Sequence, residues 1–396
     1  FKSLRFHHSG KTIEGKIREY LADVEISHTK GLEKIRDKTL QKVKHLTANN
    51  EKYETFLHVL NTEWLYKGTD ASPDIFMEHK KTTENLSDIR EYRHLLFRIF
   101  MLNKKGAIRN DAMKTEWDKI IQNHVMNKTK EPAGYEENYF YHRIYVEYYH
   151  RINSFEKSRY HQKLLVKNLE SRMDLLVKIK PRYMTELNNL ALVHCVNKEM
   201  EKANEVMNKL LQMQNWDMNT IETHLFANYT TLAYSNLLNG FLCAKDFDKG
   251  VEIAKQAEIF VNSHTTDSFY KSSLFLNLAT VYLYTSNFNA ALVWNNALLN
   301  ESSRHYREDG HTLARIFNLI IHYELGHEEL LPYLVRSTYR FIHKRKRLYK
   351  IENAILQFIQ NKLFKSNSNK ELLKFFKELK TELQEITKNS YESTVL

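Results

Sequence analysis

The chain has 396 residues, of which 42% are hydrophobic, while only 10 are glycine and 4 are proline. This scarcity of glycine and proline removes most tight turns and favours long helices. A net charge of +11 favours acidic partners in general, whereas 2 cysteines argue against a disulfide-stabilised secreted protein, and no apolar run reaches the ~18 residues of a membrane span.

The first part of the chain predicts helical hairpins that share no clear repeat. Residues 1–11 carry no periodic pattern, and we expect a disordered or truncated segment there. From 12 to 126 apolar residues recur at helical spacing, and two such stripes are Tyr53, Phe56, Leu57, Leu60 and Trp64, and Tyr92, Leu95, Leu96, Ile99 and Phe100. Breaks at 68–74 and 127–134 each contain a proline, and we expect a hinge at the second.

A repeated asparagine marks the region from 135 to 350. Each copy is followed by leucine and another apolar residue, with an aromatic or histidine ring three places further on. The four copies are Asn189, Asn236, Asn277 and Asn318, spaced 47, 41 and 41 residues apart. This period predicts one helix-turn-helix unit that recurs along the chain.

The predicted turns repeat as well. A short polar corner is followed by a bulky apolar residue and, three places later, by a small one; the bulky residues are Phe155, Met200, Phe247 and Phe288. Wherever both marks occur, the bulky residue lies 11 places after the asparagine. Two independent marks at one offset argue against a chance pattern.

These marks resemble the tetratricopeptide repeat. In that family the first helix carries leucine, a small residue and an aromatic ring, and a second small residue enters the next helix. Two copies follow this scheme: Leu190, Ala191, His194 and Ala203, and Leu278, Ala279, Tyr282 and Ala291. The resemblance covers about residues 135 to 345 and implies an all-α, right-handed α-solenoid of antiparallel helical hairpins.

The period of 41 to 47 residues is longer than the ~34 of the tetratricopeptide family, so each unit carries extra helical turns. Stacking like that of HEAT or armadillo repeats is therefore the alternative architecture. The pattern is similar to uncharacterised bacterial tetratricopeptide-like proteins with long helices, a resemblance that supplies no role. Residues 351–388 predict capping helices, and we expect a disordered tail at 389–396.

The repeated asparagines are the first candidates for a binding site. By the resemblance, Asn189, Asn236, Asn277 and Asn318 line a concave groove, where an amide can hold a peptide backbone as both donor and acceptor. We call these four asparagines the ladder. Arg143 precedes them in the chain and could bind a charged end of the ligand. The alternatives are that the amides brace neighbouring repeats, and that Arg143 and Glu147 form a solvated pair at i,i+4 spacing.

Two further stretches allow a functional or a structural interpretation. The aromatic and basic run at 139–151 could stack nucleic-acid bases, although its helical spacing fits a packed helix better. The basic patch of Arg336, Arg340, Lys344 and Arg347 could contact nucleic acid, lipid headgroups or an acidic protein. Its alternative is a solvated helix end whose cations complement the helix dipole.

No catalytic, nucleotide-binding or metal-binding motif stands out among the 19 histidines or elsewhere. We therefore expect no enzyme activity, no cofactor, no metal and no small-molecule substrate. Cys195 and Cys243 are predicted to be buried thiols. We expect a cytoplasmic protein, although a start at Phe1 suggests missing upstream residues and leaves a signal peptide open.

The sequence thus predicts a scaffold that binds a protein or peptide segment, of acidic character given the basic surplus, along the concave face of a helical-repeat array. A peptide-responsive regulator that closes about the 127–134 hinge is one alternative. A nucleic-acid-binding helical array that uses the basic patch at 336–350 is the other.

Overall fold

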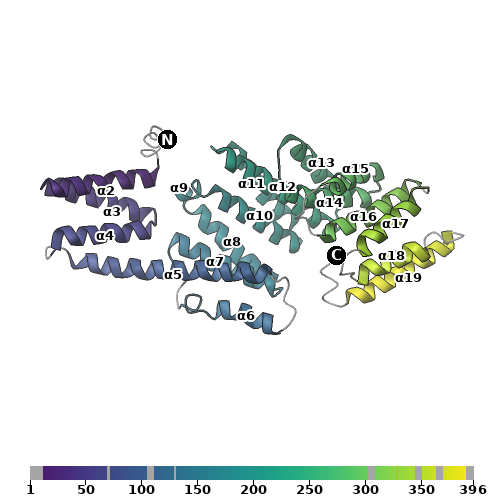
Figure 1. Cartoon of the computed structure of the whole chain (residues 1–396), viewed down its shortest axis with the longest axis horizontal. Helices are drawn as coiled ribbons and strands as arrows, with labels where there is room; N and C mark the ends of the chain where they lie inside the picture. The colour runs from purple at the N-terminus through teal and green to yellow at the C-terminus, as the bar shows by residue number, and fades with distance from the viewer. Residues whose placement is uncertain are drawn as a thin grey trace. The chain divides into compact units, whose positions relative to one another are not determined.

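The structure is a computed structural model that describes residues 12–68, 72–104, 111–128, 131–301, 308–327, 329–343, 350–362 and 369–388. Within these residues the regular elements are helices, without a strand (Figure 1). The predicted all-α class is confirmed. The chain forms two compact units, Phe1–Val193 and His194–Leu396.

The first unit is built from helices that pack against their neighbours in the chain. They are α2 (Ile13–Thr29), α3 (Glu33–Asn49), α4 (Tyr53–Lys67), α5 (Pro73–Lys104), α6 (Asp111–Ile121), α7 (Tyr135–Arg151), α8 (Phe155–Glu170), α9 (Met173–Leu176) and the start of α10 (Lys180–Val196). The long helix α5 contacts α4 and also α7. It therefore links the N-terminal hairpins to the hairpin of α7 and α8.

Apolar side chains at helical spacing form the core of the N-terminal hairpins, where Ile17 and Val24 of α2 meet Leu40 and Val43 of α3. The expected stripes are buried only in part. Among their members, Trp64 is 60% exposed and Phe100 is 54% exposed. Helical periodicity locates an apolar stripe, but it does not decide which of its residues the neighbouring helix covers.

The second unit continues from the end of α10. Its elements are α11 (Met200–Gln212), the 3-10 turn η2 (Met213–Asn215), α12 (Thr220–Ala244), α13 (Phe247–Ser263), α14 (Ser268–Tyr284), α15 (Phe288–Asn300), α16 (Glu308–Glu324), α17 (Leu331–His343), α18 (Lys350–Asn361) and α19 (Asn369–Thr387). Pairs α12–α13, α14–α15 and α16–α17 are antiparallel hairpins (Figure 1).

The predicted corners adopt one repeated backbone conformation. The first residue of each has a left-handed backbone with φ between 57° and 60°: Asn153, Lys198, Lys245 and Ser286. In each corner a following N–H donates to the carbonyl five residues earlier; the pairs are Ser154 to Tyr149, Glu199 to His194, Asp246 to Phe241 and Asn287 to Tyr282. This closure is the Schellman motif. Three of the accepting residues are ring positions of the predicted repeat, so the sequence register reflects a real structural period.

Two glycines of the second unit lie in different packing environments. A Cβ atom at Gly240 of α12 would lie 2.9 Å from the Sγ and Cβ atoms of Cys195 and 2.8 Å from Cε of Met200. At Gly250, where other repeats carry alanine, the nearest atoms would lie at 3.7 Å. Glycine is therefore required by packing at 240, while position 250 has room for a methyl group.

The last helices cover the apolar side of the final hairpin. Phe358 of α18 packs with Leu319 of α16 and Val335 of α17, and Phe375 and Leu379 of α19 lie against this cluster. A helical array requires such cover, because its last repeat otherwise exposes an apolar face. No helix in the described part of the chain is both long and apolar enough to cross a membrane.

Candidate functional site

The first helices of the hairpins in the second unit lie side by side. Helix α12 contacts α14, and α14 contacts α16, whereas α13 packs on α14 and α15 packs on α16. Each of α12 and α14 buries most of its circumference in these contacts. The remaining side of each helix is a stripe of half-buried and exposed residues, and the asparagines lie on it.

We call this surface the amide face and define it by eight residues: Tyr229, Leu232, Asn236 and Asn239 of α12, and Tyr270, Ser273, Asn277 and Thr280 of α14. The two sets are related by the 41-residue period, position by position. Asn239 is exposed and the other seven are half-buried. Each row therefore begins with a tyrosine, continues with leucine or serine, and ends with two amide or hydroxyl positions.

The asparagine side chains link adjacent repeats. Asn277 Nδ2 donates to the Ser235 carbonyl at 2.8 Å and to the Ser235 Oγ at 2.9 Å, which joins α14 to α12. Asn318 Oδ1 accepts from Asn295 Nδ2 at 3.4 Å, which joins α16 to α15. Both amides thus brace their neighbours, as the structural interpretation of the ladder expects.

Bracing uses only part of the hydrogen-bonding capacity of this surface. Within the described residues, Asn277 Oδ1 and Asn318 Nδ2 form no hydrogen bond, and neither do the side chains of Asn239 and Ser273. Each amide offers acceptor and donor groups at opposite edges. One edge of Asn277 is therefore fixed by α12, while its other edge remains able to accept a hydrogen bond.

One end of the amide face is aromatic and is bounded by a polar cluster. The Tyr229 and Tyr270 rings meet edge to face, with centroids 6.3 Å apart. Beyond them Asp267, the residue before α14, accepts from Asn228 Nδ2 at 2.7 Å and contacts His224 Nε2 at 3.0 Å. The Asn228 Oδ1 in turn accepts from the Asp267 backbone N–H at 2.9 Å. This second asparagine fixes the start of α14 against α12.

Asn189 and Arg143, the candidate binding residues of the first unit, lie in a different environment. Both contact Glu186, which is fully buried. Its carboxylate accepts from Tyr139 Oη at 2.9 Å, from Arg143 at 3.2 Å and from Gln162 Nε2 at 3.0 Å. Asn189 Nδ2 donates to the same carboxylate at 3.1 Å. Asn189 and Arg143 therefore converge on a buried acid.

The charge of Arg143 is matched within the protein. Its side chain is 20% exposed and that of Glu147 is 22% exposed, so this i,i+4 pair is less solvated than expected. Burial opposes the guanidinium charge, but the carboxylates of Glu186 and Glu147 outweigh it and raise the pKa of Arg143. Two carboxylates around one guanidinium leave no excess positive charge there for the end of a ligand.

The aromatic run of α7 packs with its own neighbours. Tyr139, Phe140 and Ile144 are buried. The His161 ring of α8 stacks on Tyr145 with centroids 4.6 Å apart and on Tyr149 at 5.6 Å. The rings of this helix thus take part in packing between α7 and α8, as the helical spacing favours.

The basic patch is described only in part. Arg336 and Arg340 of α17 are exposed, and Arg336 Nε donates to the Pro332 carbonyl at 3.2 Å. Lys344 and Arg347 lie outside the described residues. The structure therefore places two cations on the surface of α17, and the patch as a whole stays a prediction.

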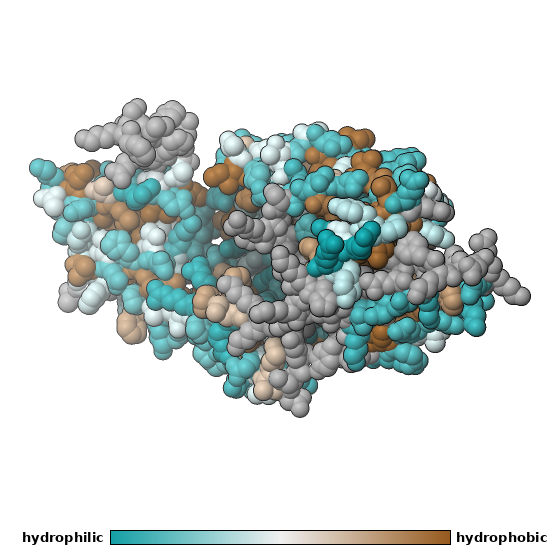
Figure 2. Space-filling model, turned by 45° about the vertical axis from the view of Figure 1, so that its right-hand side comes forward, coloured by the Kyte–Doolittle hydropathy of each residue, from teal (hydrophilic) through white to brown (hydrophobic). Residues whose placement is uncertain are grey.

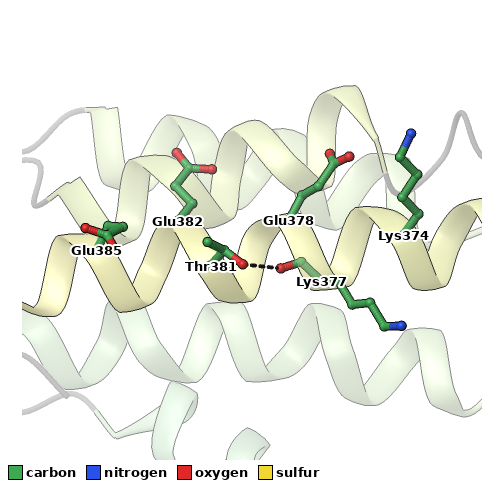
Figure 3. Close-up of a pocket in the computed structure, with 6 residues that line it drawn as sticks. All are labelled: Lys374, Lys377, Glu378, Thr381, Glu382 and Glu385. Carbon is green, nitrogen blue, oxygen red and sulfur yellow. Dashed lines mark hydrogen bonds between the residues drawn. The ribbon is translucent and has the colours of Figure 1, made fainter.

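Other surface features carry less chemistry. On the face seen in Figure 2, hydrophobic residues are scattered among hydrophilic ones. A shallow depression along α19 is lined by one helix alone, through Lys374, Lys377, Glu378, Thr381, Glu382 and Glu385. Figure 3 shows these side chains spread along the helix, with the Thr381 hydroxyl donating to the Lys377 carbonyl at 3.0 Å. Among the described residues, no group of three His, Cys, Asp or Glu side chains could hold a metal ion.

The two cysteines differ from each other. Cys195 is buried, and this burial raises the pKa of its thiol to about 12. Cys243 is exposed, so the prediction that both are buried thiols is wrong for Cys243. It lies on α12 one turn beyond Asn239, and therefore continues the exposed stripe rather than the core.

The sequence pattern identified Asn236 and Asn277 of the amide face but not the residues around them. Three further pairs are each separated by 41 residues: Tyr229 and Tyr270, Leu232 and Ser273, and Asn239 and Thr280. The 41-residue period could have identified them, because residues three, four or seven places from Asn236 have counterparts at the same distance from Asn277. The leucine and ring positions of the repeat gave the stronger signal, since they form the core.

Comparison with known proteins supports the fold alone. No protein-family model matches the chain, and no curated protein sequence matches it significantly. Among solved structures, the crystal structure of the apo form of RapI aligns with 91% of this chain and 93% of its own, with a TM-score of 0.53 and 10% sequence identity. The chain is therefore similar in fold, over nearly its whole length, to a solved structure with little sequence in common.

Proposed function

We propose that this chain acts by binding, without catalysis, and that it holds an extended peptide or protein segment across the amide face of α12 and α14. The observation that carries this proposal is the set of polar groups on that face that form no hydrogen bond within the described residues: Asn239, Ser273 and Asn277 Oδ1. An extended peptide presents alternating N–H and C=O groups, which need partners of both kinds.

The spacing of the two rows suits an extended ligand. Packed helices lie about 8–10 Å apart, and an extended chain advances about 3.3 Å per residue. The rows of Asn236 and Asn277 would therefore meet peptide groups about three residues apart along the ligand. The amide of Asn277 is already oriented by Ser235, which lowers the entropic cost of using its free edge.

A selection from a random peptide library tests this proposal. Purified protein is panned against the library, and the affinity of selected peptides is measured for the double variant Asn239→Ala with Ser273→Ala. Because each hydrogen bond contributes about 1 kcal/mol, we expect at least a roughly tenfold loss of affinity with an unchanged melting temperature. The matched control is Asn262→Ala, an exposed amide on α13.

Two results would refute the proposal. One is a library that yields no binding peptide. The other is a set of selected peptides that bind the double variant as tightly as the unaltered chain. Peptides that lose as much affinity for Asn262→Ala as for the double variant would refute it as well. Asn277→Ala is less informative, because it also removes the hydrogen bonds to Ser235 that join α14 to α12 and should lower the stability of the second unit by about 1 kcal/mol.

A peptide-responsive regulator is the second candidate. Asn277 both braces α12 and α14 and faces the proposed ligand, so a bound segment would act on two repeats at once. Such a ligand changes the relative energies of two arrangements only if it contacts them differently. A scattering radius that changes when a selected peptide is added would support regulation, and an unchanged radius would support a rigid scaffold.

A further inference from the structure

The amide face lacks charge, although the whole chain carries a net charge of +11. None of its eight residues is charged at neutral pH. The nearby carboxylate of Asp267 already has two partners, Asn228 and His224. None of the eight residues could act as its counter-ion, so a charged ligand side chain lying over them, away from Asp267, would lose hydration without compensation, which is unfavourable for binding.

The tyrosine end of the face has a different character. Tyr229 and Tyr270 are half-buried and meet edge to face, with centroids 6.3 Å apart. Leu232, also half-buried, follows Tyr229 one turn further along the same side of α12, while Ser273 takes the corresponding place on α14. A third ring or an aliphatic side chain can add to such a group, because aromatic rings combine a large apolar area with a defined geometry. The apolar end therefore passes directly into the polar positions.

We propose that the bound segment is uncharged where it crosses α12 and α14, and that it places an apolar or aromatic side chain against Tyr229, Leu232 and Tyr270. This inference rests on the proposed function and specifies the chemical character of the ligand. The basic surplus of the chain lies elsewhere, so it does not select the part of the ligand that contacts the amide face.

The experiment compares peptides selected from a random library at 50 mM and at 500 mM NaCl. Screening weakens interactions between charges but leaves apolar contacts and neutral hydrogen bonds in place. We expect selected peptides without enrichment in acidic or basic residues, with affinities that agree within about twofold at the two salt concentrations. We also expect a recurrent aromatic or aliphatic residue whose replacement by alanine costs about tenfold.

A charge placed on the face provides a second readout. Asn239 is exposed, so Asn239→Lys should fold normally, and we expect it to weaken uncharged peptides by about tenfold through lost hydrogen bonds and desolvation of the added cation. Asn262→Lys on α13 adds the same charge outside the face and should leave the affinity unchanged.

The outcomes separate the two proposals. Peptides that bind the amide face but are rich in charged residues, and that lose more than about tenfold in affinity at high salt, overturn this inference while the proposed function stands. An Asn239→Lys variant that binds uncharged peptides as well as the unaltered chain overturns both, because Asn239 is also one of the groups on which the proposed function rests. A library without any binder overturns both.

Discussion

Glu137 offers a direct test of how the first unit responds to pH. It lies in the first turn of α7 and is 8% exposed, and its Oε1 has no hydrogen-bond partner among the described residues. Burial, followed by repulsion from Asp88 and Glu51, raises its pKa to about 7, while Lys128 and the Gly134 backbone oppose this only in part. The side chain is therefore protonated in the folded protein under mildly acidic conditions.

The sign of the effect follows from the two pKa values. The unfolded carboxyl has a pKa near 4.5 and the folded one near 7. Well below pH 4.5 the folded and the unfolded state both hold the proton, so Glu137 does not change the free energy of unfolding there. As the pH rises from 4.5 to 7 only the unfolded state releases its proton, so the folded state loses stability, up to about 3 kcal/mol above pH 7.

The perturbation is Glu137→Gln, which keeps the size and polarity of the side chain but cannot ionise. We expect the variant to match the unaltered protein at pH 4 and to be more stable by up to about 3 kcal/mol at pH 8. Hydrogen exchange of the α7 amides, measured by mass spectrometry on both proteins at each pH, reports this local difference.

Glu156→Gln is the matched control, because Glu156 is an exposed carboxylate in the first turn of the neighbouring helix α8. It should change α7 exchange little at any pH. Equal protection of α7 in Glu137→Gln and the unaltered protein at pH 8 would refute the reasoning. A difference that stays constant from pH 4 to pH 8 would refute it as well, since ionisation would then play no part.

Three further outcomes follow from packing, charge and exposure. Gly250→Ala should stabilise the second unit by roughly 0.5–1 kcal/mol, because alanine has the higher helix propensity and the site has room for its methyl group. Gly240→Ala should destabilise the same unit by roughly 1–3 kcal/mol, because its Cβ atom would lie about 2.9 Å from Cys195. The melting temperature should therefore rise in the first variant and fall in the second, and shifts of the same sign would contradict the packing. Glu186→Ala should cost about 3–5 kcal/mol in chemical denaturation, because it leaves a largely buried arginine without its buried carboxylate, and a loss below about 1 kcal/mol would contradict the buried network. A maleimide should label Cys243 and spare Cys195 in the folded protein, and equal labelling rates would contradict their assigned burial.

The repeat period could be predicted from the sequence because the same residues serve the same contacts in each copy. Leu237 and Leu278 are fully buried, and the rings of Phe241 and Tyr282 belong to residues whose carbonyls close the turns. Such positions tolerate few side chains, so they repeat visibly. The corner residues, such as Lys245 and Ser286, share a left-handed backbone instead of a residue type, and the sequence shows them only through the register.

The contacts of the candidate site were harder to predict. Asn189 and Asn277 share a sequence register, yet Asn189 binds a buried carboxylate while Asn277 binds the backbone and hydroxyl of Ser235. The difference depends on Glu186, which lies three residues before Asn189, and on partners in other helices such as Gln162. A one-dimensional pattern records which residue repeats, but its partner across the helix interface is set by tertiary packing.

Photocrosslinking tests the central claim most directly, because it reports where a ligand lies without depending on stability. Thr280 is replaced by p-benzoylphenylalanine in one variant and Asn262 in another, and each is irradiated with a peptide selected from the library. If the segment lies across α12 and α14, the peptide is joined covalently to the first variant and not to the second. Crosslinking at position 262 with none at position 280 would place the ligand on another surface and contradict the account.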